Sequence, residues 1–111
     1  MNKPQMKNID KATVLQLKDL VQYQKGQIVS KTLTQNKHVS LTLFAFDQGE
    51  EISSHASHGD AMVTVLDGTA RITIGDGQHV VKAGETIVMP AEVPHAVAAE
   101  EPMKFCLTVV F

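Results

Sequence analysis

The chain has 111 residues, of which 43% are hydrophobic and 20% are charged, and its formal net charge is -2. This length suits one domain, and the apolar content is high enough for a folded core, so the composition excludes a disordered chain. No basic cluster is present to contact nucleic acid, and no apolar run is long enough to cross a bilayer. The N-terminus is polar and lacks the apolar stretch of a secretory signal, so we expect a cytoplasmic protein.

The first segment with an apolar pattern, residues 12–23, fits two interpretations. Val14, Leu17 and Val21 have the spacing of a helical stripe, whereas residues 14–17 alternate as in a strand. We favour a short strand there, followed by a turn or a single helical turn over residues 18–23.

From residue 27 onward the dominant period of the apolar residues is two, which predicts strands. The predicted strands are residues 27–34, 38–46, 61–66, 70–74, 79–81, 86–89, 95–98 and 104–111. Turns rich in glycine and aspartate separate them, as at residues 67–68 and 75–77. Short strands punctuated in this way predict an antiparallel sandwich or barrel. The single cysteine, Cys106, agrees with a reducing compartment and is expected to be a buried small hydrophobe in the last strand.

The five histidines are the candidates for chemistry, because imidazole is both a metal ligand and an acid–base group near neutral pH. His38 and His79 are expected at the surface. His55 and His58 follow a polar stretch where one strand leads to the next. His95 follows two prolines, so its side chain is presented from a rigid turn.

Two spaced motifs around these histidines make the chain resemble the cupin superfamily. The first motif is glycine, five residues, His-x-His, three or four residues, glutamate, six residues and glycine. The second is glycine, five residues, proline, one residue, glycine, two residues, histidine, three residues and asparagine. The matching positions are Gly49, His55 and Gly68 in the first motif and Gly84, Pro90 and His95 in the second.

This resemblance implies a small single-domain cupin of the cupin 2 type. The expected fold is all-β, a small jelly-roll-type antiparallel β-barrel, with one domain over residues 1–111 and the barrel at about residues 26–111. Such domains commonly dimerise, so we expect a homodimer, and strand edges near residues 27–35 are candidates for pairing across a two-fold axis. Neither nucleic acid nor a membrane is an expected partner.

The departures from the motifs concern the metal ligands that the resemblance implies. Metal-binding cupins use two histidines and the glutamate of the first motif together with the histidine of the second. Here His55 and His95 stand at ligand positions, but Ser57 replaces the second histidine. Ala61, or Met62 on the longer gap, replaces the glutamate. Serine and alanine are poor ligands for Zn, Ni, Mn or Fe, so half of the set is missing.

His58 is the candidate replacement ligand, which makes His55, His95 and His58 the candidate metal site, although we favour the interpretation that His58 is a solvated loop residue. Residues three apart on a strand point to opposite faces, so His58 joins His55 only if the chain bulges near Gly59. The alternative is that His58 and Asp60 are solvated loop residues. Asp60 and then Glu92 are the nearest carboxylates available to complete a site.

A pocket with mostly apolar walls is predicted from strand parity. If Ala61 points inward, alternate residues on its strand and its neighbours do so too. The candidate ligand-pocket residues are Val63, Val65, Ile72, Met89 and Val97. The alternative is that these side chains only fill the core of a small barrel.

These features favour a protein that binds a divalent metal, a small organic ligand, or both, in the barrel. It is either a metal-dependent enzyme, such as an oxygenase or isomerase, or a metal-free small-molecule binding or sensing module. A barrel kept mainly for self-association is a third hypothesis. No nucleophile–base arrangement is visible, so no catalytic residue is assigned.

Overall fold

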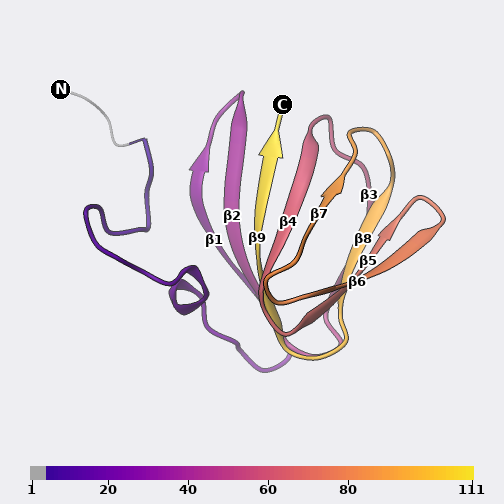
Figure 1. Ribbon diagram of the computed structural model, residues 1–111, viewed down its shortest axis with the longest axis horizontal. Helices are drawn as coiled ribbons and strands as arrows, with labels where there is room; N and C mark the ends of the chain where they lie inside the picture. Colours follow the sequence, from indigo (N-terminus) through magenta and orange to yellow (C-terminus); the bar gives the residue numbers. More distant parts are fainter. Residues whose placement is uncertain (1–4) are drawn as a thin grey trace.

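The alternating apolar residues form strands that close into two facing sheets. The computed structural model describes residues 5–111, so residues 1–4, the start of the polar N-terminal stretch, lie outside it. One sheet has five strands in the order β1 (Ile28–Gln35), β2 (Val39–Phe46), β9 (Met103–Val110), β4 (Asp60–Asp67) and β7 (Thr86–Met89). The other has four, in the order β3 (Glu51–His55), β8 (His95–Ala99), β5 (Thr69–Ile74) and β6 (Gly77–Lys82). Figure 1 shows the two groups of strands diverging from a common base.

The paired neighbours are antiparallel in both sheets, which confirms the expected all-β antiparallel class. Each strand predicted from residue 27 onward is present, with its ends shifted by at most two residues. β3 was not predicted, because its sequence Glu-Ile-Ser-Ser-His lacks alternating apolar residues. It forms by pairing with β8 at the edge of the four-stranded sheet, so tertiary contact outweighs its weak intrinsic preference.

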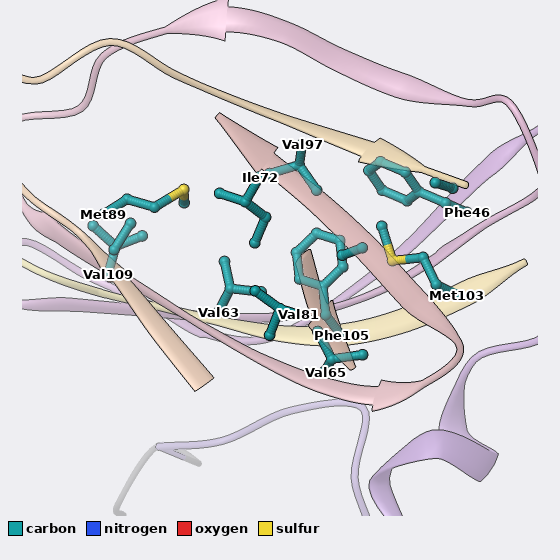
Figure 2. Packing of buried hydrophobic residues seen from close by; sticks show 13 residues of the cluster. Phe46, Val63, Val65, Ile72, Val81, Met89, Val97, Met103, Phe105 and Val109 are labelled. Atoms are coloured by element: carbon teal, nitrogen blue, oxygen red, sulfur yellow. The ribbon is translucent and has the colours of Figure 1, made fainter. Parts of the chain in front are cut away.

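The inner faces of the two sheets form the core, as Figure 2 shows. Phe46, Val63, Ile72, Met103 and Phe105 are almost completely buried there. They alternate with outward residues along their strands, as a half-buried sheet requires. The core fills the barrel at the end where β4 leads into β5, and it leaves the opposite end, where β3 meets β8, for other side chains.

The predicted strand at residues 14–17 is wrong. The structure has no strand there and has a 3-10 helix, η1 (Leu17–Leu20), which agrees with the expected helical turn. Val14 is completely exposed, since this segment pairs with no sheet. Leu17, Leu20 and Val21 instead pack on the outer face of the five-stranded sheet, so their spacing reflects a helical turn.

The N-terminal segment, residues 5–27, covers the outer face of the five-stranded sheet on the side away from the four-stranded one (Figure 1). The buried Lys104 ammonium donates to the carbonyl of Lys18 at 2.7 Å and lies 4.8 Å from the centre of the Tyr23 ring. Cys106 is buried under the same segment, as expected. Among residues 5–111, no helix is both long enough and apolar enough to cross a membrane.

Backbone contacts also join this segment to β1, the outermost strand of its sheet. The amide of Lys7 donates to the carbonyl of Leu33 at 2.8 Å, and the Asn8 side chain donates to the carbonyl of Thr32 at 2.8 Å. Part of the edge expected to pair in a homodimer is therefore already bonded within the chain. The dimer remains a prediction, and within the part of the chain that the structure describes these bonds do not reach the start of β1, near Ile28.

Candidate functional site

Two strand ends bring His55 and His95 together at the end of the barrel opposite the core. His55 is the last residue of β3, His95 is the first residue of β8, and the two are partners in the antiparallel register. Their ring centres are 4.3 Å apart and their Nε2 atoms are 3.1 Å apart. His95 is 3% exposed, whereas His55 is exposed at the mouth. One imidazole is thus set in the wall and the other at the opening.

Each ring is held by a backbone carbonyl two residues before it. Nδ1 of His55 is 3.0 Å from the oxygen of Ser53, and Nδ1 of His95 is 3.1 Å from the oxygen of Val93. A carbonyl oxygen only accepts hydrogen bonds, so both Nδ1 atoms carry the proton and donate it. In the neutral rings, both Nε2 atoms therefore present a lone pair.

The surroundings of His95 favour its neutral ring. Burial lowers the pKa of His95, and the neighbouring His55 lowers it further, against the opposing effect of the Val93 carbonyl. Two lone pairs at this separation repel each other unless a positive centre, either a proton or a metal ion, lies between them. The arrangement is therefore a pair of nitrogen acceptors 3.1 Å apart.

Two loops around the mouth fix the positions of these strand ends. The loop before β8 contacts the loop after β3, since the amide of Glu92 donates to the carbonyl of Ser57 at 2.8 Å. The amide of Ala91 donates to a carboxylate oxygen of Asp60 at 2.8 Å. Gly59 lies so close to the carbonyl of Val110 that a Cβ atom there would clash with it. The path of the first loop thus depends on a glycine.

A cavity extends inward from the histidine pair. Its volume is about 70 Å³. Three of the residues that line it are polar, namely His55, Ser57 and His95. The rest of the lining is apolar, namely Phe44, Ile52, Ala61, Met89, Val97, Phe105, Leu107 and Val109. Apolar walls with a few polar groups at one end are the usual design of a small-molecule site.

The structure places the predicted pocket residues in two groups. Met89 and Val97 line the cavity with the histidine pair. Val63, Val65 and Ile72 are buried deeper in the core and do not line it.

Sequence reasoning missed several residues that line the cavity, including Phe44 on β2 and Phe105 and Leu107 on β9. The alternation along residues 105–109 is the signal that could have found the β9 residues, because every second side chain of that strand points inward.

His58 is not brought to the pair. Its chain does leave strand geometry, but its side chain is 92% exposed and Nδ1 donates to Glu92 at 3.0 Å. Asp60 and Glu92 are likewise engaged outside the cavity lining. Within the described part of the chain, no three His, Cys, Asp or Glu side chains are arranged to hold a metal ion. His38 and His79 are exposed, as expected.

The pair nevertheless fits two positions of one divalent ion. Nitrogen ligands lie about 2.0–2.1 Å from zinc, which puts neighbouring ligands roughly 2.9–3.4 Å apart. The Nε2 separation of 3.1 Å falls in this range. Metal-binding histidines usually donate their other ring N–H to a carbonyl or carboxylate, and both rings do so here. The donor set is therefore suitable in kind and incomplete in number.

Comparisons with known proteins identify the family and the fold. The sequence profile of the family described as Cupin domain matches residues 42–111. A comparison with curated protein sequences found no match.

Three solved structures show the extent of the likeness. A conserved protein of unknown function from Streptococcus pyogenes is 44% identical with a TM-score of 0.95, over 97% of this chain and 95% of that one. A cupin superfamily protein from Desulfitobacterium hafniense is 28% identical with a TM-score of 0.92, over 97% and 99%. A cupin 2 conserved barrel domain protein from Leptotrichia buccalis is 42% identical with a TM-score of 0.83, over 85% and 46%. The expected fold, a jelly-roll-type β-barrel, is confirmed.

Proposed function

This chain belongs to the cupin domain family, and we propose that its barrel binds a small organic molecule beside a divalent transition metal held by His55 and His95. The observation that carries this proposal is the pair of carbonyl-anchored rings. Their Nε2 atoms lie 3.1 Å apart, and both rings line an apolar cavity that opens to solvent. Zn, Ni, Mn and Fe all accept imidazole nitrogen, so the donors do not select among them.

Some residues of the site orient the imidazole rings, and others keep water away from the ligand. The carbonyls of Ser53 and Val93 hold the two rings in the tautomer that leaves Nε2 free. The apolar wall around Met89 and Phe105 excludes water and contacts the body of the organic molecule. A metal bound here would act as a Lewis acid on an oxygen of that molecule.

The lining of the cavity supports binding of a ligand rather than catalysis. The residues that line the cavity include no carboxylate, so the imidazoles are the titratable groups within reach of a ligand. A proton-transfer step would need a further group placed by the ligand itself. We therefore propose binding and assign no catalytic residue.

A metal-free binding module is the second candidate, and the apolar lining favours it. With most of the wall apolar, a hydrophobic molecule gains from burial whether or not a metal is present. A ligand hydroxyl could donate directly to the free Nε2 of His95 in that case.

Calorimetry on untagged, chelator-treated protein tests the first candidate against the second. Titration with Co²⁺, Ni²⁺ and Zn²⁺ should show one site. His95→Ala removes a direct ligand, so it should weaken binding by more than the about 10- to 100-fold that the loss of an outer-shell partner costs. His79→Ala is the matched control, because His79 is exposed on β6 and does not line the cavity.

Unchanged metal affinity in both His95→Ala and His55→Ala would exclude the proposed site. A thermal shift with small aromatic molecules that is the same with and without chelator would favour the metal-free module.

A further inference from the structure

Residues 11–16 of the N-terminal segment form an exposed tip between two anchored stretches. Before the tip, the Asn8 side chain is hydrogen-bonded to β1, and after it Leu17 packs on the outer face of the five-stranded sheet. Val14, in the tip, is 100% exposed, and Leu15 beside it is 37% exposed. Within residues 5–111, no amide of the tip donates to a backbone carbonyl. The tip therefore presents two apolar side chains and unpaired backbone groups to solvent.

A second group of exposed apolar side chains lies on the outer face of the same sheet. This outer patch consists of Met62 on β4, Val88 on β7 and Val110 on β9, which are 38%, 50% and 58% exposed. Their neighbours along the chain belong to the inner core, so these three side chains point outward. Met62 and Val88 are register partners. None of the three packs under the N-terminal segment, which leaves the patch uncovered within one chain.

A single chain does not bring the tip and the patch together. In Figure 1 the N-terminal segment lies beyond β1, whereas β7 is at the opposite edge of the five-stranded sheet. The complete exposure of Val14 means that it packs against no part of its own chain. The anchors at Asn8 and Leu17 hold the tip on its own side of the sheet. A second copy, by contrast, carries both features and is free to approach.

The charges beside the tip and the patch are complementary. Residues 11–18 contain two lysines, Lys11 and Lys18, and no acidic residue. On the patch side Asp60 begins β4 on the same face as Met62, and neither β4 nor β7 contains a basic residue. Lys11 and Asp60 form no ion pair among residues 5–111. Opposite charges at the two features favour the approach of one copy to another.

We propose that two copies of this chain pair through the outer faces of their five-stranded sheets, and that the tip of each copy covers the outer patch of the other. Apolar side chains of both features then leave water together, which supplies the driving force. Because each copy has one tip and one patch, a two-fold axis satisfies both contacts at once and closes the assembly as a dimer. This interface differs from pairing between β1 edges, and it does not depend on what the barrel binds.

Sedimentation velocity of the full chain over a range of concentrations tests the interface. We expect the wild type to dimerise, and Val14→Asp or Val88→Asp to weaken the dimer about 10- to 100-fold each, because each places a charge where a valine is buried on pairing. Val80→Asp is the matched control, since Val80 is 59% exposed on β6 of the other sheet and should leave the dimer unchanged. Circular dichroism checks folding, and Val14→Asp removes no packing from the single chain.

Cross-linking between two variants tests which surfaces meet. Val14→Cys is mixed with Val88→Cys, one of them carrying a small tag, and a short bismaleimide is added. We expect cross-linked pairs that contain one chain of each kind, and far fewer when Val80→Cys replaces Val88→Cys. Wild-type protein controls for Cys106, which is buried.

Three results would overturn the proposal. The first is a wild type that stays monomeric at every concentration measured. The second is a dimer that neither Val14→Asp nor Val88→Asp weakens, which would place the interface elsewhere, as at the β1 edge. The third is assemblies that keep growing with concentration, since a tip and a patch that meet without a two-fold axis form open chains.

Discussion

At Glu92 the backbone adopts a left-handed conformation, with φ of 66°. A side chain strains this conformation, and glycine adopts it without a Cβ penalty. The position corresponds to the second glycine of the second cupin motif, so the structure explains why a glycine suits it. Here the strained residue joins the two mouth loops, because its amide donates a hydrogen bond to the carbonyl of Ser57. The strain therefore lies in the turn that presents His95.

Replacement of Glu92 by glycine should relieve this strain, whereas replacement by alanine should keep it. Both variants lose the contact with His58, so their difference isolates the backbone. We expect Glu92→Gly to have a free energy of unfolding about 1 kcal/mol higher than Glu92→Ala, measured by urea denaturation. His58→Ala controls for the exposed contact and should change stability by less than about 1 kcal/mol. Equal stabilities of the two Glu92 variants would contradict this account.

His55 and His95, the two central residues of the site, were predictable because the spacing of the two motifs identifies them. His55 and His95 fall on the spacing of the two motifs, and the structure brings them together. His58 is 92% exposed, in agreement with the favoured interpretation of a solvated loop residue. The path of its loop was not predictable, because it depends on the close approach of Gly59 to Val110 and on the hydrogen bond from Glu92 to Ser57, which join residues distant in sequence. Contacts of that kind leave no local periodicity to read.

Among the elements, the N-terminal segment shows how local pattern and tertiary contact compete. Residues 14–17 alternate, yet they form no strand because the outermost strand, β1, is already bonded to residues 7 and 8 over part of its length. The segment is fastened instead by polar contacts to the outer sheet face. The Tyr23 hydroxyl donates to Asp67 at 2.5 Å, beside the Lys104 ammonium. Nothing in the sequence around Tyr23 indicates a partner 44 residues away.

The stabilisation from the contact between Tyr23 and Asp67 should decrease at high pH. Burial and the contact with Asp67 raise the pKa of Tyr23 above its usual 10.0, and burial raises the pKa of Cys106 above its usual 9.0. A group whose pKa is higher in the folded state stabilises the fold below its unfolded pKa. That contribution is lost as the pH rises beyond it. The free energy of unfolding should therefore fall as the pH rises through about 9 to 10 and above.

Tyr23→Phe separates the tyrosine from the cysteine in this effect. The variant lacks the hydrogen bond to Asp67, so it should be about 1–3 kcal/mol less stable at neutral pH. Because phenylalanine does not ionise, the gap from the wild type should narrow above about pH 10. Urea denaturation across this range measures both quantities. A gap that stays constant with pH would show that the Tyr23 phenol has the same pKa in both states.

For the molecule as a whole, the barrel divides into a filled end and a hollow end. Ile72 and Val65 pack in the filled end, whereas the cavity with His55 and His95 occupies the other. Alternation predicted that these strands bury one face, and it could not predict where along the barrel the packing leaves a space. That depends on the joint volume of side chains from several strands.

Truncation in the filled end should therefore change stability and leave the site intact. Ile72→Ala removes a completely buried side chain and should lower the free energy of unfolding by about 2–5 kcal/mol. Val80→Ala, on the adjoining strand β6, is the control, since Val80 is 59% exposed and should change stability by less than about 0.5 kcal/mol. Co²⁺ affinity of the folded protein should be the same in both. A loss of affinity in Ile72→Ala would show that the two ends are coupled.

The carbonyl anchors of the two imidazoles have a consequence for how such a barrel can evolve. Every amino acid supplies a carbonyl, so substitution at Ser53 or Val93 leaves the acceptors of both rings in place. The wall of the cavity, by contrast, consists of side chains that single mutations replace. Ligand preference can therefore change through successive substitutions in the wall. The orientation of the two imidazole rings is retained, because backbone carbonyls hold them. The same site thus combines ring orientations that tolerate mutation with a cavity wall that mutation can change.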